Sequence, residues 1–277
     1  MITYLRLKKK DAGILGGVLT EEYIQKLDTD RLFTLGAFDG SEEEGFRPVG
    51  AIIISMERGP QNDIYGCLRW LYVIPDYREL SIADQLLGRL TDICKDSGIS
   101  QIVTYAPLHM VGYLTNVYMY NRYEDYKSRA LNLKQILAGR INQYVKKTDP
   151  HVIPLKDLTR QDCHHLLGQL PKTALTTSYR PDEEISYVYQ KNGKITASLF
   201  ACINGLGQIQ PIYMHCEQGA EAQLLYILYA AGQHLAQKYG PHTDICVISN
   251  KESAWKLIKY LLPDIEPEEV VRLVDYI

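Results

Sequence analysis

The stretch from Leu71 to Leu90, LYVIPDYRELSIADQLLGRL, constrains the fold of this chain more than any other part of it. Its apolar start predicts a β-strand that ends at Pro75, and a short turn containing Arg78 leads into a helix that opens near Ser81. The first turn of a helix carries backbone N–H groups without partners inside the helix, and the helix dipole is positive there. This strand, turn and helix therefore predict an anion site suited to a phosphate or a diphosphate.

The start of this helix has a second interpretation. The run from Ser81 to Asp84 fits the capping-box pattern S-x-x-D, which serves only to start a helix. In that case the Asp84 carboxylate satisfies a backbone donor and adds negative charge beside the anion site. The two interpretations can coexist, and the sequence leaves both open.

Strand and helix patterns alternate through the first half of the chain. Strands are predicted at 2–7, 32–38, 49–56, 64–74, 99–106 and 123–133, and helices at 20–27, 81–98 and 113–120. An antiparallel meander followed by a β-α-β crossover predicts a mixed α/β sheet.

The second half of the chain repeats this order. Beyond residue 137 the pattern loosens, and residues 138–150 predict a linker. Strands follow at 152–155, 185–190, 195–203, 208–215, 244–249 and 270–276, with helices at 159–170, 220–239 and 252–261. The segment IADQLLGRL at 82–90 also aligns with AEAQLLYIL at 220–228. We therefore predict two domains in tandem, residues 1–137 and residues 151–277.

A spaced pattern of apolar, basic and small residues runs through the turn and the helix start: Val73-x-Pro75-x-x-Arg78-x-x-Ser81-x-Ala83, followed by Leu86-Leu87. It resembles the acyl-CoA diphosphate loop of the GNAT acetyltransferase superfamily, V-x-P-x-x-[RQ]-x-x-G-x-[GA]. Ser81 replaces the first glycine of that pattern. The predicted element order is also that of the GNAT fold. The resemblance therefore implies an α/β fold with two GNAT-like mixed-sheet domains in tandem.

GNAT proteins move an acyl group from a CoA thioester to an amine. The resemblance thus implies an N-acyltransferase with acetyl-CoA as the acyl donor and a primary amine as the acceptor. It places the acyl-CoA site in the first domain, with these CoA contacts: Leu71, Tyr72, Val73, Arg78, Glu79, Leu80, Ser81, Ile82 and Ala83.

The resemblance also implies a catalytic acid. The segment from Tyr118 to Glu124 resembles the family's Y-x-x-x-G-F-E segment, in which a tyrosine helps the CoA thiolate to depart. Tyr118 is the residue expected in this role, and Tyr113 and Tyr120 are its competitors. A tyrosine on an amphipathic helix also fits a packing role.

The general base is less defined. The strand at 64–74 carries no carboxylate, although relatives commonly place one there. Glu57 and Asp63 are the nearest candidates in the sequence, and both also fit exposed turn charges. A water-relayed base, or an acceptor amine with a low pKa, would remove the need for either.

The second domain is expected to be a degenerate copy. Under the repeat alignment Gly219 stands at the position of Ser81, Glu221 at that of Ala83, and Cys216 at that of the arginine. A carboxylate pointing into a diphosphate site repels the ligand strongly at short range. We therefore expect the second domain not to bind CoA.

Composition bounds the partners and the compartment. Among 277 residues, 46% are hydrophobic and 23% charged, and the net charge is −3. This balance gives no electrostatic reason to expect nucleic acid or a membrane as partner. No signal peptide and no membrane span is predicted, and six scattered cysteines without a C-x-x-C pair suit a cytoplasmic protein. No metal site is expected, because the adjacent His and Cys residues cannot form a chelate alone. A monomer and a homodimer both remain open.

A function from another class also remains open: a non-catalytic pseudoenzyme that binds CoA or recruits a partner protein. The serine at position 81, the strand without a carboxylate and the degenerate second copy favour it. The retained Val73, Pro75 and Arg78 spacing and the presence of Tyr118 favour the enzyme.

Overall fold

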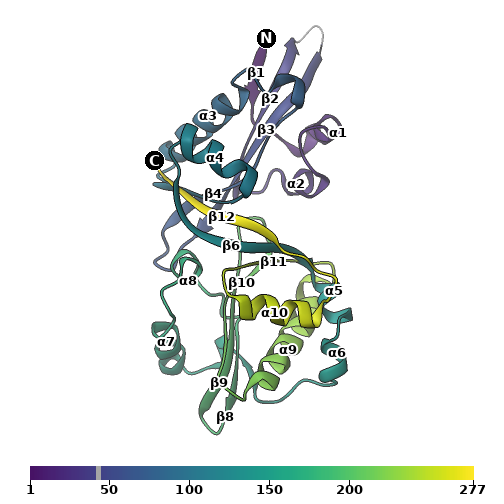
Figure 1. The fold of residues 1–277 in the computed structure, drawn as a ribbon, viewed down its shortest axis with the longest axis vertical. Helices are drawn as coiled ribbons and strands as arrows, with labels where there is room; N and C mark the ends of the chain where they lie inside the picture. Colours follow the sequence, from purple (N-terminus) through teal and green to yellow (C-terminus); the bar gives the residue numbers. More distant parts are fainter. Residues whose placement is uncertain (42–44) are drawn as a thin grey trace. The chain divides into compact units, whose positions relative to one another are not determined.

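A computed structural model describes residues 1–41 and 45–277 of the chain (Figure 1). Its contacts divide the chain into two compact units. Unit 1 comprises residues 1–57, 64–124 and 271–277, and unit 2 comprises residues 58–63 and 125–270. These units do not follow the predicted ranges 1–137 and 151–277, because residues 125–137 lie in unit 2 and residues 271–277 lie in unit 1.

Unit 1 is a mixed sheet with helices on both faces. Its elements are β1 (Ile2–Leu5), α1 (Ala12–Leu15), α2 (Glu21–Lys26), β2 (Leu32–Ser41), β3 (Gly45–Arg58), β4 (Ile64–Val73), α3 (Ile82–Asp96), β5 (Gln101–Pro107) and α4 (Leu108–Val117). The strand order is β1-β2-β3-β4-β5, followed by the end of β12 (Glu268–Tyr276). The pairs β1–β2 and β2–β3 are antiparallel, whereas β4–β5 is parallel.

The core of unit 1 lies between the sheet and α3. Figure 1 shows α3 and α4 on one face of the sheet and α1 and α2 on the other. Leu86, Leu87 and Leu90 recur at helical spacing, so they form one apolar stripe on α3. This stripe packs in one cluster with Ile52 and Ile54 of β3, which are fully buried. The helix therefore fixes the position of its own N-terminus against the sheet.

Unit 2 repeats the mixed-sheet design. Its elements are β6 (Asn121–Asn132), α5 (Leu133–Ala138), α6 (Ile141–Tyr144), β7 (Val152–Pro154), α7 (Arg160–Gly168), α8 (Ala174–Ser178), β8 (Tyr187–Lys191), β9 (Lys194–Ile203), β10 (Ile209–Cys216), α9 (Glu221–Tyr239), β11 (Asp244–Ser249) and α10 (Glu252–Leu261). The strand order is β6-β11-β10-β9-β8-β7. Only β10–β11 is parallel among its registered pairs within the described residues.

Two strands have partners that the sequence did not predict. The strand at 123–133 was expected to return into the first domain, but β6 pairs antiparallel with β11 of unit 2. The strand at 270–276 was expected to end the second domain, but Val271 and Leu273 of β12 lie in the core of unit 1. Alternating polarity specifies which face of a strand is buried and not which strand it pairs with. Each unit is therefore completed by a strand from the other half of the sequence.

Two helical segments also differ from the prediction. α4 ends at Val117 and not at 120, because Met119 adopts a left-handed conformation with φ of 58°. In the predicted linker at 138–150, α6 forms and its Ile141 is fully buried. Within the described residues, no helix combines the length and the apolar character needed to cross a membrane.

Replacing Leu273 by alanine tests whether β12 belongs to the core of unit 1. Leu273 is 0% exposed, so we expect Leu273→Ala to lower the free energy of unfolding by about 2–5 kcal/mol. Urea unfolding measures the loss, and hydrogen exchange locates it in the strands of unit 1. Glu269→Ala, an exposed change on the same strand, is the control and should shift stability by less than about 0.5 kcal/mol. Faster exchange confined to unit 2 would contradict the assignment.

Candidate functional site

The two parallel strands of unit 1 separate before they end. Their register pairs Gly66 with Ile102 and Cys67 with Val103. The Thr104 hydroxyl then donates a hydrogen bond of 3.1 Å to the carbonyl oxygen of Leu68. The registered pairing stops there, although β4 continues to Val73 and β5 to Pro107. The carboxyl ends of parallel strands are where α/β proteins commonly bind ligands.

The turn after β4 delivers unpaired backbone amides to this end of the sheet. Ser81, just before α3, adopts a left-handed conformation with φ of 54° and ψ of 23°. Within the described part of the chain, the backbone amides of residues 81–84 make no hydrogen bond to another protein group. Four such donors at the positive end of a 15-residue helix form a group that can bind an anion.

The capping-box interpretation of this helix start is wrong. The side chain of Ser81 makes no capping hydrogen bond. The Asp84 carboxylate turns away from the N-cap and accepts hydrogen bonds from the hydroxyls of Tyr113, at 3.0 Å, and Tyr118. Because the carboxylate is engaged elsewhere, it leaves the amide of Ser81 unpaired.

The two tyrosines lie at the carboxyl end of α4. Their hydroxyl oxygens are 3.1 Å apart, and their rings meet edge to face with centroids separated by 5.2 Å. Burial, the hydrogen bond to Asp84 and the neighbouring Tyr113 hydroxyl raise the pKa of Tyr118. Burial also raises the pKa of Tyr113. Tyr118 therefore keeps its proton well into alkaline pH. Tyr120, the other competitor, is 3% exposed and belongs to the core.

Arg78 fastens the turn to the end of β4. Its Nε donates a hydrogen bond of 3.1 Å to the carbonyl oxygen of Val73, and its guanidinium carbon lies 5.9 Å from the ring centroid of Tyr72. The side chain is exposed, so its positive charge remains accessible at the turn. Arg78 thus combines a structural contact with a charge placed close to the unpaired amides.

The nine predicted CoA contacts fall into three classes of exposure. The side chains of Val73 and Ile82 are buried, so only their backbone can reach a ligand. Leu71, Tyr72 and Ala83 are half-buried. The remaining four residues are exposed: Arg78, Glu79, Leu80 and Ser81. The nine residues lie at the end of β4, in the turn after it and in the first turn of α3.

Sequence reasoning missed the part that Gly50 plays in shaping this path. A Cβ atom at Gly50 would lie 3.2 Å from the carbonyl oxygen of Tyr72 and 3.3 Å from Cγ2 of Ile82. Glycine lets β3 approach the end of β4 closely, and the amide of Ile74 then donates to the carbonyl of Val49 at 3.0 Å. A single glycine inside an apolar strand gives no signal by which this role could have been found.

Glu57 is a buried structural group and not an exposed turn charge. It is 3% exposed, and one carboxylate oxygen lies 2.5 Å from the Arg69 guanidinium. The Ser55 hydroxyl donates to Glu57 at 2.6 Å and accepts from Nε of Arg69 at 2.8 Å. Removing one partner of a buried ion pair is costly, so Glu57 is poorly placed to act as a mobile base. Asp63, the other candidate, is exposed in the β3–β4 turn.

The corresponding turn of unit 2 keeps a left-handed residue but has fewer unpaired amides. The amide of Ala220 donates to the carbonyl oxygen of Glu217 at 3.0 Å, and α9 begins one position later in the repeat alignment. Gly219 adopts φ of 84°, also left-handed, at the position aligned with Ser81. The Glu221 carboxylate accepts a hydrogen bond of 3.2 Å from the amide of Gly219. In unit 2 an acidic side chain thus takes up the donor and adds negative charge at the start of α9.

Comparison with solved structures shows that the fold is shared. A tandem GNAT protein from the clavulanic acid biosynthesis pathway is 11% identical, with 100% of this chain and 98% of that chain covered and a TM-score of 0.55. A GCN5-related N-acetyltransferase from Sphaerobacter thermophilus is 10% identical, with 99% of this chain and 95% of that chain covered and a TM-score of 0.54. Identities this low establish the fold and not the activity.

Comparison with family models finds a match in the first part of the chain. A search of curated proteins finds no match. Residues 10–116, which contain the β4 turn, the start of α3 and Tyr113, match the model of the Acetyltransferase (GNAT) family. The structural neighbours extend the same fold over the whole chain. Residues 10–116 therefore resemble a GNAT acetyltransferase domain, and the chain as a whole has the fold of two GNAT-like domains in tandem.

Proposed function

We propose that this chain is an N-acyltransferase that moves an acetyl or other short acyl group from acyl-CoA to a primary amine in unit 1. The observation that carries the proposal is the set of unpaired amides at residues 81–84, at the positive end of α3. We expect the working form to be a cytoplasmic monomer or homodimer that uses acetyl-CoA as donor and requires neither nucleic acid nor membrane.

The start of α3 suits the CoA diphosphate. Four amides and the helix dipole offer donors and positive potential at one place, and Arg78 adds a full charge. The Ser81 side chain is exposed and has a hydroxyl that can also donate to a phosphate oxygen. In this proposal the contacts with CoA come from Leu71, Tyr72, Val73, Arg78, Glu79, Leu80, Ser81, Ile82 and Ala83.

The proposed catalytic tyrosine, Tyr118, directly follows α4, and its hydroxyl bonds to the first turn of α3. Asp84 lies in the first turn of α3 and holds the hydroxyls of Tyr113 and Tyr118. A residue of the proposed binding turn therefore also sets the position of the proposed proton donor. This coupling supports Tyr118 over Tyr120 as the tyrosine that meets the substrate.

The electrostatics define what Tyr118 can do. Acyl-CoA supplies an activated acyl group that an amine can accept, with release of the CoA thiol. A phenol whose pKa is raised gives up its proton less readily than a thiol of ordinary pKa, about 8.5. Tyr118 is therefore suited to donate a hydrogen bond to the departing sulfur, and the proton lost by the amine can neutralise the thiolate. Deprotonating an ordinary alkylammonium at neutral pH costs about 4 to 5 kcal/mol, so the acceptor amine must lose its proton to water or to a group of its own.

A second candidate function is a protein that binds CoA without catalysis. It is favoured by the engagement of Glu57 with Arg69 and of Tyr118 with Asp84, which leaves both candidate acid–base groups already bonded. Release of free CoA in the presence of a panel of amines separates the two functions. CoA binding without any release would favour the non-catalytic one.

Arg78→Glu tests the anion site. Replacing a positive by a negative charge beside the diphosphate should weaken acetyl-CoA binding at least about tenfold by Coulomb repulsion. Titration calorimetry of acetyl-CoA against the wild type and the variant measures the change. Lys95→Glu, the same charge reversal in the last turn of α3, is the matched control and should bind like the wild type. Unchanged affinity of the Arg78 variant, with its fold intact by circular dichroism, would remove the basis of the proposal.

Tyr118→Phe tests the proton donor. Loss of the hydroxyl should lower kcat about 100-fold and leave the KM for acetyl-CoA nearly unchanged, because the hydroxyl acts on the leaving group and not on binding. A thiol assay of CoA release measures both constants. Tyr123→Phe, which removes an exposed hydroxyl of β6, is the control. If turnover of the Tyr118 variant matches the wild type at every pH, the role belongs to another residue.

Asp84→Asn tests the electrostatic coupling. The Asp84 carboxylate helps to raise the pKa of Tyr118, so the amide variant should lower that pKa relative to the wild type. The raised pKa also stabilises the folded state below pH of about 10, and this contribution is lost as pH rises through the folded-state pKa. Ultraviolet titration of tyrosinate, with Tyr118→Phe subtracted, follows the group directly. An unchanged titration would show that the carboxylate does not control it.

A further inference from the structure

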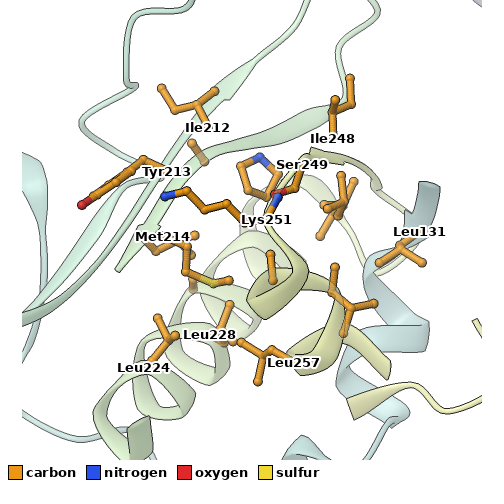
Figure 2. A pocket seen from close by; sticks show the side chains of 18 of the residues that line it. Leu131, Ile212, Tyr213, Met214, Leu224, Leu228, Ile248, Ser249, Lys251 and Leu257 are labelled. Atoms are coloured by element: carbon orange, nitrogen blue, oxygen red, sulfur yellow. The ribbon is translucent and has the colours of Figure 1, made fainter. Parts of the chain in front are cut away.

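Unit 2 contains an apolar cavity of about 560 Å³. It lies where the parallel strands β10 and β11 separate, since their register pairs only Ile209 with Ile245, and residues of α9 and α10 line it. The volume falls within the range of about 300–1,000 Å³ that is usual for small-molecule sites. Figure 2 shows aliphatic side chains of β10, β11, α9 and α10 converging on it, among them Ile212, Met214, Leu224, Leu228, Ile248 and Leu257.

This cavity is open to solvent, since the exposed residues Lys251 and Ser253 line it. Water gains little along its apolar walls, because polar partners are scarce there. A ligand with a flexible aliphatic chain would make dispersion contacts along the Leu, Ile and Met side chains.

One cation lies at this cavity. Lys251, at the N-cap of α10, lines it, and its ammonium lies 5.3 Å from the ring centroid of Tyr213 (Figure 2). Lys251 is exposed and makes no ion pair with a carboxylate of the described residues. The adjacent Glu252 is paired with Lys127 at 3.2 Å. The positive charge of Lys251 is thus available to an anionic head group.

The anion that fits here is a single carboxylate and not a diphosphate. At the start of α9 the Glu221 carboxylate accepts from the amide of Gly219, and Glu221 also lines the cavity. Each further negative charge on a ligand adds to the repulsion from Glu221. A single carboxylate is matched by the single positive charge of Lys251.

We propose that unit 2 is a binding site for an unbranched aliphatic carboxylate, a fatty acid, with its chain in the cavity and its carboxylate beside Lys251. The site uses residues of unit 2 alone. It does not depend on the function proposed for unit 1, and either can fail without the other.

Calorimetry with the full chain tests the proposal with octanoate, decanoate and dodecanoate below their micelle concentrations. We expect one molecule bound per chain, and a Kd that falls about fourfold for each added methylene. Decanol, which has the same chain and no charge, should bind more weakly than decanoate.

Two kinds of variant locate the aliphatic chain and the carboxylate of the bound fatty acid. Ala254→Phe on α10 fills the cavity and should abolish binding of decanoate and decanol, and Ala254→Leu, a smaller filling, should weaken both. Lys251→Met should weaken decanoate about tenfold or more and leave decanol unchanged. Lys256→Met removes an exposed charge of the same helix outside the cavity, so it should bind both ligands like the wild type.

Several results would overturn the proposal. One is that none of the three acids binds, and another is that the Kd does not change with the length of the acid. A third is that Ala254→Phe and Ala254→Leu both fold and bind decanoate like the wild type. Equal losses for decanoate and decanol in Lys251→Met would overturn the assignment of the head group. Displacement of decanoate by acetyl-CoA in the Arg78→Glu variant would make the cavity a CoA site and not a fatty-acid site.

Discussion

The carboxylate of Asp84 decides what the start of α3 can do. A carboxylate in the first turn of a helix usually satisfies the local backbone donors and the helix dipole. Here it accepts from two tyrosine hydroxyls at the end of α4. The Ser81 amide, which this carboxylate would otherwise cap, joins the unpaired amides of residues 82–84, and the Tyr118 hydroxyl is held next to the start of α3. One side chain thus links the geometry of the anion site to that of the tyrosine.

The two units use one scaffold in different ways. In both, parallel strands pair briefly and then separate, and a left-handed residue precedes the long helix: Ser81 in unit 1 and Gly219 in unit 2. The difference lies in where the acidic side chain points. Asp84 reaches across to another helix, whereas Glu221 bonds to the amide of Gly219 itself. The two acidic residues stand one position apart in the repeat alignment, and in unit 2 the carbonyl oxygen of Glu217 also accepts from the amide of Ala220.

Much of this architecture could be predicted from the sequence, and its limits have physical causes. The strands and long helices follow from hydrophobic periodicity, and the turn after β4 from its proline and its helix start. The role of Asp84 could not be predicted, because the S-x-x-D spacing is identical whether the carboxylate caps its own helix or reaches another. The burial of Glu57, given as a candidate base or an exposed turn charge, could not be predicted either, since its partner Arg69 lies on the next strand and only strand pairing brings the two together. The strand partners of β6 and β12 could not be predicted either, because the alternation of polar and apolar residues within a strand does not specify the strand with which it pairs.

The path of β12 ties the end of the sequence to the core of unit 1. Val271, Leu273 and Val274 come from the last strand of the sequence and are at most 1% exposed, and the contacts place residues 271–277 in unit 1. Burying three such side chains contributes about 5–9 kcal/mol by transfer alone, which is comparable with the total stability of about 5–15 kcal/mol of an ordinary domain. The second half of the chain therefore cannot be deleted without removing core side chains from unit 1.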